Sequence, residues 1–216
     1  MLHVLCGKRL QALAYHPPML EQRIQKQFFD SADLKYSAAE VLSQPIADAV
    51  GAIIDCITAG GKVLACGNGG SAGDAQHFAA EFVGRFERER PGLAAIALTT
   101  DTSILTAIGN DYSFEAIYSK QVQALGAPGD VLLAISTSGN SANVLAAVDA
   151  AHAKEMVVVA MTGRGGGKMN ERLAETDIHI CVPHERTTRI QEVHLLTMHC
   201  ICDAVDLQLL GEIEKS

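Results

Sequence analysis

A histidine and a glutamate, His77 and Glu81, stand four residues apart on a predicted helix that follows a glycine-rich loop. Residues at this spacing lie on one face of a helix. A carboxylate placed there can take a proton from carbon, an imidazole can donate one to oxygen, and the two together can bind a divalent metal ion. The alternative is a solvated helical pair that contributes only about 0.2–0.5 kcal/mol to stability.

The glycine-rich loop before this helix, Gly67-Asn68-Gly69-Gly70-Ser71, follows an apolar run that predicts a strand. Its glycines let the backbone approach a ligand closely, and Ser71 can cap the helix. The loop lacks both the G-x-G-x-x-G spacing of dinucleotide sites and the lysine of a Walker loop. An ordinary strand-to-helix turn has a similar composition, so this loop alone leaves its role open.

A second loop, Ser136-Thr137-Ser138-Gly139-Asn140-Ser141, carries four hydroxyl groups and ends where another helix begins. The amides at a helix N-terminus carry partial positive charge, so an acidic protein can bind phosphate there. Capping alone requires one hydroxyl, and we therefore interpret this loop as a phosphate or sugar site. A third segment, Thr99–Asp101 followed by Gly109-Asn110-Asp111, is a weaker signal because such residues occur in many turns.

The elements that must position these loops are apolar runs that alternate with helical patterns. The runs are residues 62–66, 94–98, 131–135, 156–161 and 178–182, and the helical patterns are residues 72–85, 103–108, 114–124, 142–153, 168–173 and 188–210. This alternation predicts a parallel sheet with crossover helices. In such sheets ligands bind at the carboxyl ends of the strands, where the loops lie.

Two further helices are predicted ahead of the first strand, over residues 19–42 and 45–59. Pro45 stands in the first turn of the second of these, and Gly60-Gly61 ends it. Residues 1–18 make a poor secretory signal, since their basic residues follow the apolar run. We expect residues 1–18 to be a disordered or misassigned extension and residues 19–216 to form one domain.

Composition limits the classes of function. The formal charge of −8 over 216 residues argues against a nucleic-acid or anionic membrane surface. No apolar run reaches the roughly 18–20 residues of a membrane span. The six cysteines show neither a disulfide nor a zinc-ribbon pattern, which is typical of a reducing cytoplasm.

The motifs CGNGGS, DAQHFAAEF, LTAIGND, ISTSGNSANV and RIQEVHLLTMH occur in this order from residue 66 to residue 199. With them the chain resembles the sugar isomerase (SIS) superfamily, and within it the family of phosphoheptose isomerases. The resemblance covers residues 19–216. It implies a three-layer αβα sandwich with a five-stranded parallel sheet in flavodoxin-like order and extra N-terminal helices. Matching residue by residue, it implies substrate contacts from Asn68, Gly69, Gly70, Ser71, Glu81, Asn110, Asp111, Ser136, Thr137, Ser138, Ser141 and Gln191.

The same resemblance implies that Glu81 and His199 are the catalytic pair and that His77, Glu81, Gln191 and His199 hold Zn²⁺. It also implies a homotetramer with active sites at subunit interfaces. The spacing raises one difficulty, because Gln191 and His199 are eight residues apart, about 12 Å along a straight helix. His194 is a spare ligand candidate that we expect to pack against the sheet instead. One departure is Thr188, where some of these isomerases have an aspartate.

Two functions from different classes remain. The first is a cytoplasmic aldose–ketose isomerase that converts sedoheptulose 7-phosphate to D-glycero-D-manno-heptose 7-phosphate through a cis-enediol, the first step toward ADP-heptose and the lipopolysaccharide core. The alternative is a non-catalytic SIS-domain protein that binds the replication initiator DnaA. In that branch the positions of Glu81 and His199 do not carry Glu and His, and both are present here. A third and weaker hypothesis is a sugar-phosphate sensor. The DNA-binding domain that is usually fused to such a sensor is not found among these 216 residues.

Overall fold

The computed structural model describes residues 17–212. Most of the expected extension at residues 1–18 therefore lies outside the described residues. Its last two residues, Pro17 and Pro18, belong to the first helix, so the helix begins two residues earlier than predicted.

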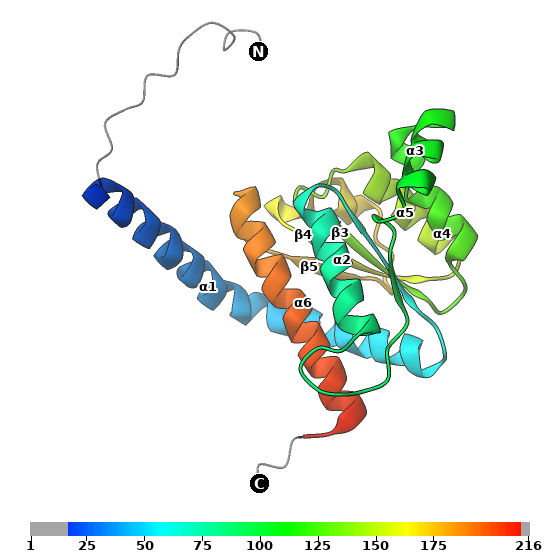
Figure 1. Ribbon diagram of the computed structural model, residues 1–216, viewed down its shortest axis with the longest axis horizontal. Helices are drawn as coiled ribbons and strands as arrows, with labels where there is room; N and C mark the ends of the chain where they lie inside the picture. Colours follow the sequence, from blue (N-terminus) through cyan, green and yellow to red (C-terminus); the bar gives the residue numbers. More distant parts are fainter. Residues whose placement is uncertain (1–16, 213–216) are drawn as a thin grey trace, which may run out of the picture.

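A parallel sheet of five strands forms the middle of the molecule (Figure 1), with the order β2-β1-β3-β4-β5. The strands are β1 (Val63–Gly67), β2 (Ala95–Ala97), β3 (Val131–Ser136), β4 (Val157–Thr162) and β5 (Ile178–Cys181). Both the parallel pairing and the flavodoxin-like order are confirmed. Because β1 and β3 are neighbours with Gly67 opposite Ile135, the two polar loops leave the sheet side by side.

The two faces of the sheet pack against different helices. Side chains alternate along a strand, so Leu132 and Leu133 point to opposite faces and join separate cores. The core around Leu133 also contains buried residues of α1 (Pro17–Thr58), α2 (Gly70–Val83) and α6 (Thr187–Leu210). The core around Leu132 is covered mainly by α4 (Ser119–Leu125) and α5 (Ala142–His152). The result is the three-layer αβα sandwich that the family resemblance implied.

Three connecting segments differ from the prediction. Helix α3 (Thr102–Asp111) extends through Asn110 and Asp111, which we expected in a turn. The predicted helix over 114–124 is a short 3-10 turn, η1 (Phe114–Ala116), followed by α4. The predicted helix over 168–173 is instead a 3-10 segment, η2 (Arg164–Glu171), because three consecutive glycines within it have positive φ.

The N-terminal region is one helix of 42 residues and not two. Pro45 lies inside α1, although proline removes a backbone donor and usually breaks a helix. The helix continues because both sides of Pro45 bury apolar residues in the same core, with Leu42 before it and Ala49 and Ile53 after it. Tertiary packing outweighs the local preference here. In Figure 1 the first half of α1 extends away from the sheet.

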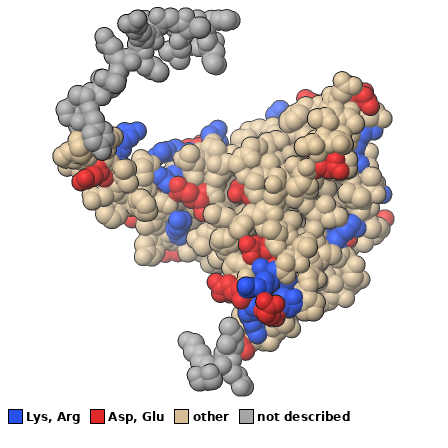
Figure 2. Space-filling view, viewed as in Figure 1, with Lys and Arg blue, Asp and Glu red and all other residues tan. Residues whose placement is uncertain are grey.

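By length and hydropathy, α1 and α6 each contain a stretch that could cross a membrane, which the sequence analysis did not anticipate. The core helix of a soluble protein meets the same criterion, and α6 packs against both α1 and α2. On the face drawn in Figure 2, acidic and basic side chains lie next to one another.

Candidate active site

Helices α2 and α6 bring together three side chains that are far apart in sequence. The Nε2 atoms of His77 and His199 lie 2.9 Å apart, and Glu81 Oε1 lies 3.7 Å from His77 Nε2. The ring of Phe86 packs 5.7 Å from that of His199, centroid to centroid. The side chain of Glu81 is 22% exposed and that of His77 is 40% exposed, so the group is sheltered but still open to a small molecule. The predicted acid/base pair therefore lies within one cluster of a single chain.

Gln191 lies at the other end of the same helix pair. Its amide occupies the space where a side chain on Gly70 would be, since a Cβ added there would meet Gln191 Nε2 at 2.5 Å. The start of α6 thus faces the start of α2, and two turns later His199 faces His77, so the helices run in the same direction. Within one chain Gln191 remains about 12 Å along the helix from His199. The structure does not bring all four predicted metal ligands together.

The remaining three ligand candidates suit a metal ion by chemistry. Imidazole nitrogens and a carboxylate oxygen are the donors that zinc binds. Two of the donors already face each other across 2.9 Å, and the carboxylate is a short movement away. Within residues 17–212, however, no three His, Cys, Asp or Glu side chains meet the geometry of a formed metal centre. By the chemistry of its donors, this set of side chains fits zinc.

The glycine-rich loop is fixed by two residues that sequence reasoning missed. Asn68 and Asn143 exchange reciprocal amide hydrogen bonds of 2.8 Å, and the Tyr118 hydroxyl donates to the Gly67 carbonyl oxygen at 2.5 Å. Burial raises the pKa of Tyr118 to about 12, which keeps the phenol protonated as a donor. Asn143 comes from the first turn of α5, so the pair ties the loop after β1 to the loop after β3.

Hydroxyl groups of the loop after β3 bond within the loop, since Ser138 Oγ accepts from the Asn140 amide at 3.2 Å and Ser136 bonds to Ser141. Ser136 Oγ donates to Ser141 Oγ at 2.9 Å, yet Ser141 makes no side-chain capping bond to α5. Thr137 and Ser138 are half-buried. Side-chain capping of α5 therefore does not account for the Ser141 hydroxyl, and a role of this loop in binding a ligand stays a prediction. These hydroxyls lie at the start of α5, where the backbone amides of a helix N-terminus carry partial positive charge.

A glycine segment holds the hydroxyl-rich loop in place. Gly139 has φ +64°, and a Cβ there would overlap the carbonyl oxygen of Gly166. The Met169 amide donates to the Gly139 carbonyl oxygen at 3.0 Å, and the Lys168 amide donates to Asn140 Oδ1 at 3.0 Å. The backbones of the loop and of η2 are interlocked, which only glycine permits at these points.

Several predicted site residues lie elsewhere. Asn110 Nδ2 donates to Asp111 Oδ1 at 2.9 Å, both side chains are exposed, and their hydrogen bonds reach no other predicted site residue. Ser71 is buried beneath the glycine loop, where its amide bonds to the Asn68 carbonyl oxygen.

Three histidines outside the His77–His199 cluster make structural hydrogen bonds or ion pairs. His194 is fully buried and bonds to the Thr162 carbonyl oxygen at 3.0 Å, as expected for packing against the sheet. Two histidines that no sequence motif singled out, His152 and His179, also have buried partners. His152 pairs with Asp177 at 2.7 Å, and His179 on β5 bonds to the Thr162 hydroxyl at 2.7 Å. Neither partner is near in sequence, so no local pattern could reveal the contacts.

The surroundings of Glu81 are acidic as well as apolar. Burial first, and then the nearby carboxylates of Glu81 and Asp206, raise the pKa of the Cys202 thiol to about 12. Cys202 is therefore a neutral packing residue. The Glu81 carboxylate lies close enough to α6 to affect the charge of this thiol. Asp206 in turn pairs with Arg90, a buried residue that the sequence analysis did not single out.

Comparison with known proteins gives consistent matches. A family model described as SIS domain matches residues 27–163. The chain is 82% identical over 194 residues to a phosphoheptose isomerase from Methylibium petroleiphilum, covering 90% of this chain and 97% of that protein. The solved phosphoheptose isomerase from Neisseria gonorrhoeae matches with a TM-score of 0.83 and 55% identity, covering 87% of this chain and 98% of that one. A phosphoheptose isomerase from Francisella tularensis matches with the same TM-score and 46% identity, over 86% of this chain and 97% of the other.

Proposed function

The chain belongs to the SIS domain family, and we propose that it is an aldose–ketose isomerase that converts sedoheptulose 7-phosphate to D-glycero-D-manno-heptose 7-phosphate. The observation that carries this proposal is the convergence of Glu81 and His199 around His77, which lies on a helix that begins in the glycine-rich loop after β1. Relatives that cover almost the whole described chain are named phosphoheptose isomerases. None of the relatives named above is described as binding the replication initiator, and the scaffold alternative gains no support.

The reaction moves a carbonyl from C2 to C1 of the sugar. One proton leaves C1, another is added to C2, and protons shift between the two oxygens through a cis-enediol. Glu81 is placed to carry the proton between the carbons, because its carboxylate is sheltered yet open to the site. His199 is placed to donate to and accept from the oxygens, with its ring held between His77 and Phe86.

Binding would use the rest of the site. Ser136, Thr137, Ser138 and Ser141 would hold the phosphate with neutral donors, which suits a chain of net charge −8. Asn68 and the backbone of Gly69 and Gly70 would contact the sugar, with Gln191 beside them. Asn110 and Asp111 contact each other on the exposed α3, so we propose that they act at the site of a neighbouring subunit.

We propose that the cluster also binds Zn²⁺ through His77, Glu81 and His199. The implied fourth ligand, Gln191, is too far along α6 to complete the set within one chain, and we place it at the sugar end of the site instead. When bound, the ion would polarise the substrate oxygens as a Lewis acid. The chain's own task is to hold the Nε2 atoms of the two imidazoles close together and keep Glu81 within reach.

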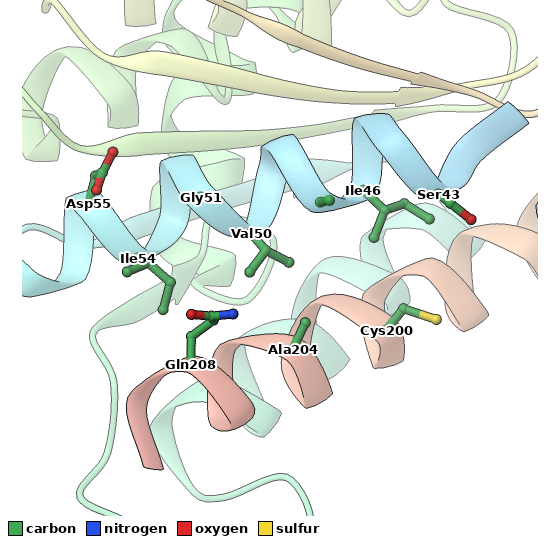
Figure 3. Close-up of a pocket in the computed structure, with 10 residues that line it drawn as sticks. Ser43, Ile46, Val50, Gly51, Ile54, Asp55, Cys200, Ala204 and Gln208 are labelled. Carbon is green, nitrogen blue, oxygen red and sulfur yellow. The ribbon is translucent and has the colours of Figure 1, made fainter. Parts of the chain in front are cut away.

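The proposal includes a homotetramer with active sites at subunit interfaces. Exposed large apolar side chains are concentrated on the part of α1 that precedes Pro45: Met19, Leu20, Ile24, Phe28, Phe29, Tyr36 and Val41. An apolar groove of about 480 Å³ lies between α1 and α6, lined by Ile46, Val50 and Ala204 among others (Figure 3). A second copy of the chain is the occupant we propose for these surfaces. We place the enzyme in the cytoplasm, in the supply of heptose for lipopolysaccharide.

The test uses purified protein and sedoheptulose 7-phosphate in deuterated water, with the aldoheptose product analysed for label at C2. Glu81→Gln and His199→Ala should each lower turnover by at least ~100-fold, the usual scale for a general acid or base. Glu175→Gln, an exposed glutamate away from the cluster, is the control and should retain full activity. Full activity in either site variant would remove that residue from the mechanism, and DnaA binding without turnover would favour the scaffold alternative.

A further inference from the structure

Arg90 and Asp206 form a buried ion pair between the loop that follows α2 and helix α6. Arg90 Nε donates to Asp206 Oδ1 at 2.5 Å, and each side chain is only 2% exposed. Burying two charges is costly, and an apolar pair of similar size is often at least as stable. Stability alone therefore does not explain why this pair is present.

The rest of the Arg90 guanidinium binds the end of α2. Its Nη2 donates to the Glu81 carbonyl oxygen at 2.8 Å, and its Nη1 donates to the Phe82 carbonyl oxygen at 2.9 Å. Helix α2 ends at Val83, so these carbonyls belong to its last turn and have no partner within the helix. A cation at this end also interacts favourably with the helix dipole. Arg90 thus directly holds the backbone of Glu81.

Asp206 connects the same guanidinium to the helix that carries His199. Asp206 follows His199 by seven residues, about two turns or 10 Å along α6. Helices α2 and α6 consequently meet at the His77–His199 contact and again through Arg90. Gln191 already contacts Gly70 where the two helices begin, so Arg90 adds a contact at the opposite end of α2, the end that carries Glu81. This contact opposes movement of that end relative to α6.

We propose that Arg90 is a positioning residue that sets the Glu81 carboxylate relative to His199 without touching the substrate. This inference rests on the proposed isomerase function. None of the hydrogen bonds of Arg90 reaches the loops after β1 and β3, which would bind the sugar phosphate. Loss of the arginine should therefore lower kcat and leave KM almost unchanged.

The decisive variants separate stability from positioning. Arg90→Met alone leaves Asp206 buried and unpaired, so both stability and kcat should fall. The double variant Arg90→Met with Asp206→Leu restores an uncharged, packed contact. We expect its Tm to return to within about 4 °C of the wild type while kcat remains at least ~10-fold lower, because Met cannot hold the Glu81 carbonyl. Its KM should stay within about twofold.

A second variant keeps the test valid if the double variant fails to fold. Arg90→Lys retains the charge opposite Asp206 but lacks the planar fork that reaches two carbonyls. It should fold and show the same loss of kcat. The exposed pair of Arg172 and Asp149 is the matched control, and its Met and Leu double variant should keep wild-type kcat. Wild-type kcat in folded Arg90 variants, or a raised KM with kcat unchanged, would overturn the proposal.

Failure of this inference can be distinguished from failure of the proposed function. A wild-type protein that does not turn over sedoheptulose 7-phosphate fails the function itself. Arg90 is then examined by hydrogen–deuterium exchange of the peptide that covers the last turn of α2. Faster exchange in Arg90→Lys than in wild type supports the positioning role, since the carbonyl cap has been lost. Equal protection in both proteins refutes it.

Discussion

Replacing His194 with glutamine should remove much of the acid sensitivity of this fold. His194 Nε2 lies 3.0 Å from the Thr162 carbonyl oxygen, which can only accept, so Nε2 must carry the proton. His194 Nδ1 is then a bare acceptor, buried without a hydrogen-bond partner. A second proton would place an unpaired charge in the core. Burial therefore lowers the pKa of His194 from 6.5 to about 4, although the bond to Thr162 opposes the change.

The sign and size of the effect follow from these two pKa values. Below pH 6.5 the unfolded chain takes up a proton on His194, whereas the folded chain stays neutral until the pH approaches 4. The unfolded state binds more protons in this window, so the stability contributed by the neutral ring is complete above pH 6.5 and is lost as the pH falls. Each pH unit is worth about 1.4 kcal/mol, which gives a total loss of about 3 kcal/mol.

The assay compares urea unfolding of the wild type and His194→Gln from pH 7.5 to pH 4. Far-UV circular dichroism is the suitable signal because the chain has no tryptophan. Glutamine can still donate to Thr162 but does not titrate. At one fixed protein concentration, the free energy of unfolding of the wild type should fall about 3 kcal/mol further than that of the variant. Parallel pH curves for the two proteins would refute the argument.

Three further substitutions test other parts of the structure. Gly139→Ala should lower the free energy of unfolding by at least ~2 kcal/mol more than Gly165→Ala, as measured by urea titration. Both glycines have positive φ, but only at Gly139 would the added Cβ clash with backbone, the Gly166 carbonyl oxygen. Asn143→Leu should raise the KM for the sugar phosphate roughly 5- to 100-fold by leaving the Asn68 amide unpaired, and an unchanged KM would contradict this role. Pro45→Ala should raise Tm if α1 is one continuous helix, and a lower Tm would favour two helices.

The fold could largely be predicted from the sequence because its strands are buried on both faces. Short apolar runs bounded by polar loops mark such strands well, and the predicted ends of all five differ from the structure by at most one residue. The error at Pro45 has the opposite cause. Local preference indicates a helix start there, but the core formed with α6 and the sheet keeps α1 continuous.

From local residue chemistry, the candidate site was predictable as far as its loops and the His77–Glu81 pair on one helix face, while His199 was assigned to it only through the family resemblance. Glycine and hydroxyl residues at strand ends signal a ligand site by their own chemistry, independent of distant contacts. Tyr118, Asn143 and Arg90 carry no such local signal. Each supports the site through a hydrogen bond to a residue nine or more positions away, and such contacts follow only from the packing of helices on the sheet.

The parallel packing of α2 and α6 explains why the site has two ends. Gln191 and Gly70 lie where both helices begin, next to the strand ends and the proposed phosphate loop. His77 and His199 lie about two turns further along, where the same two helices meet again. A sugar phosphate extended along this helix pair would place its phosphate at the loops and its reacting carbons at Glu81. The spacing of residues on two parallel helices would then select a chain length of sugar, which a single loop or a single helix could not do.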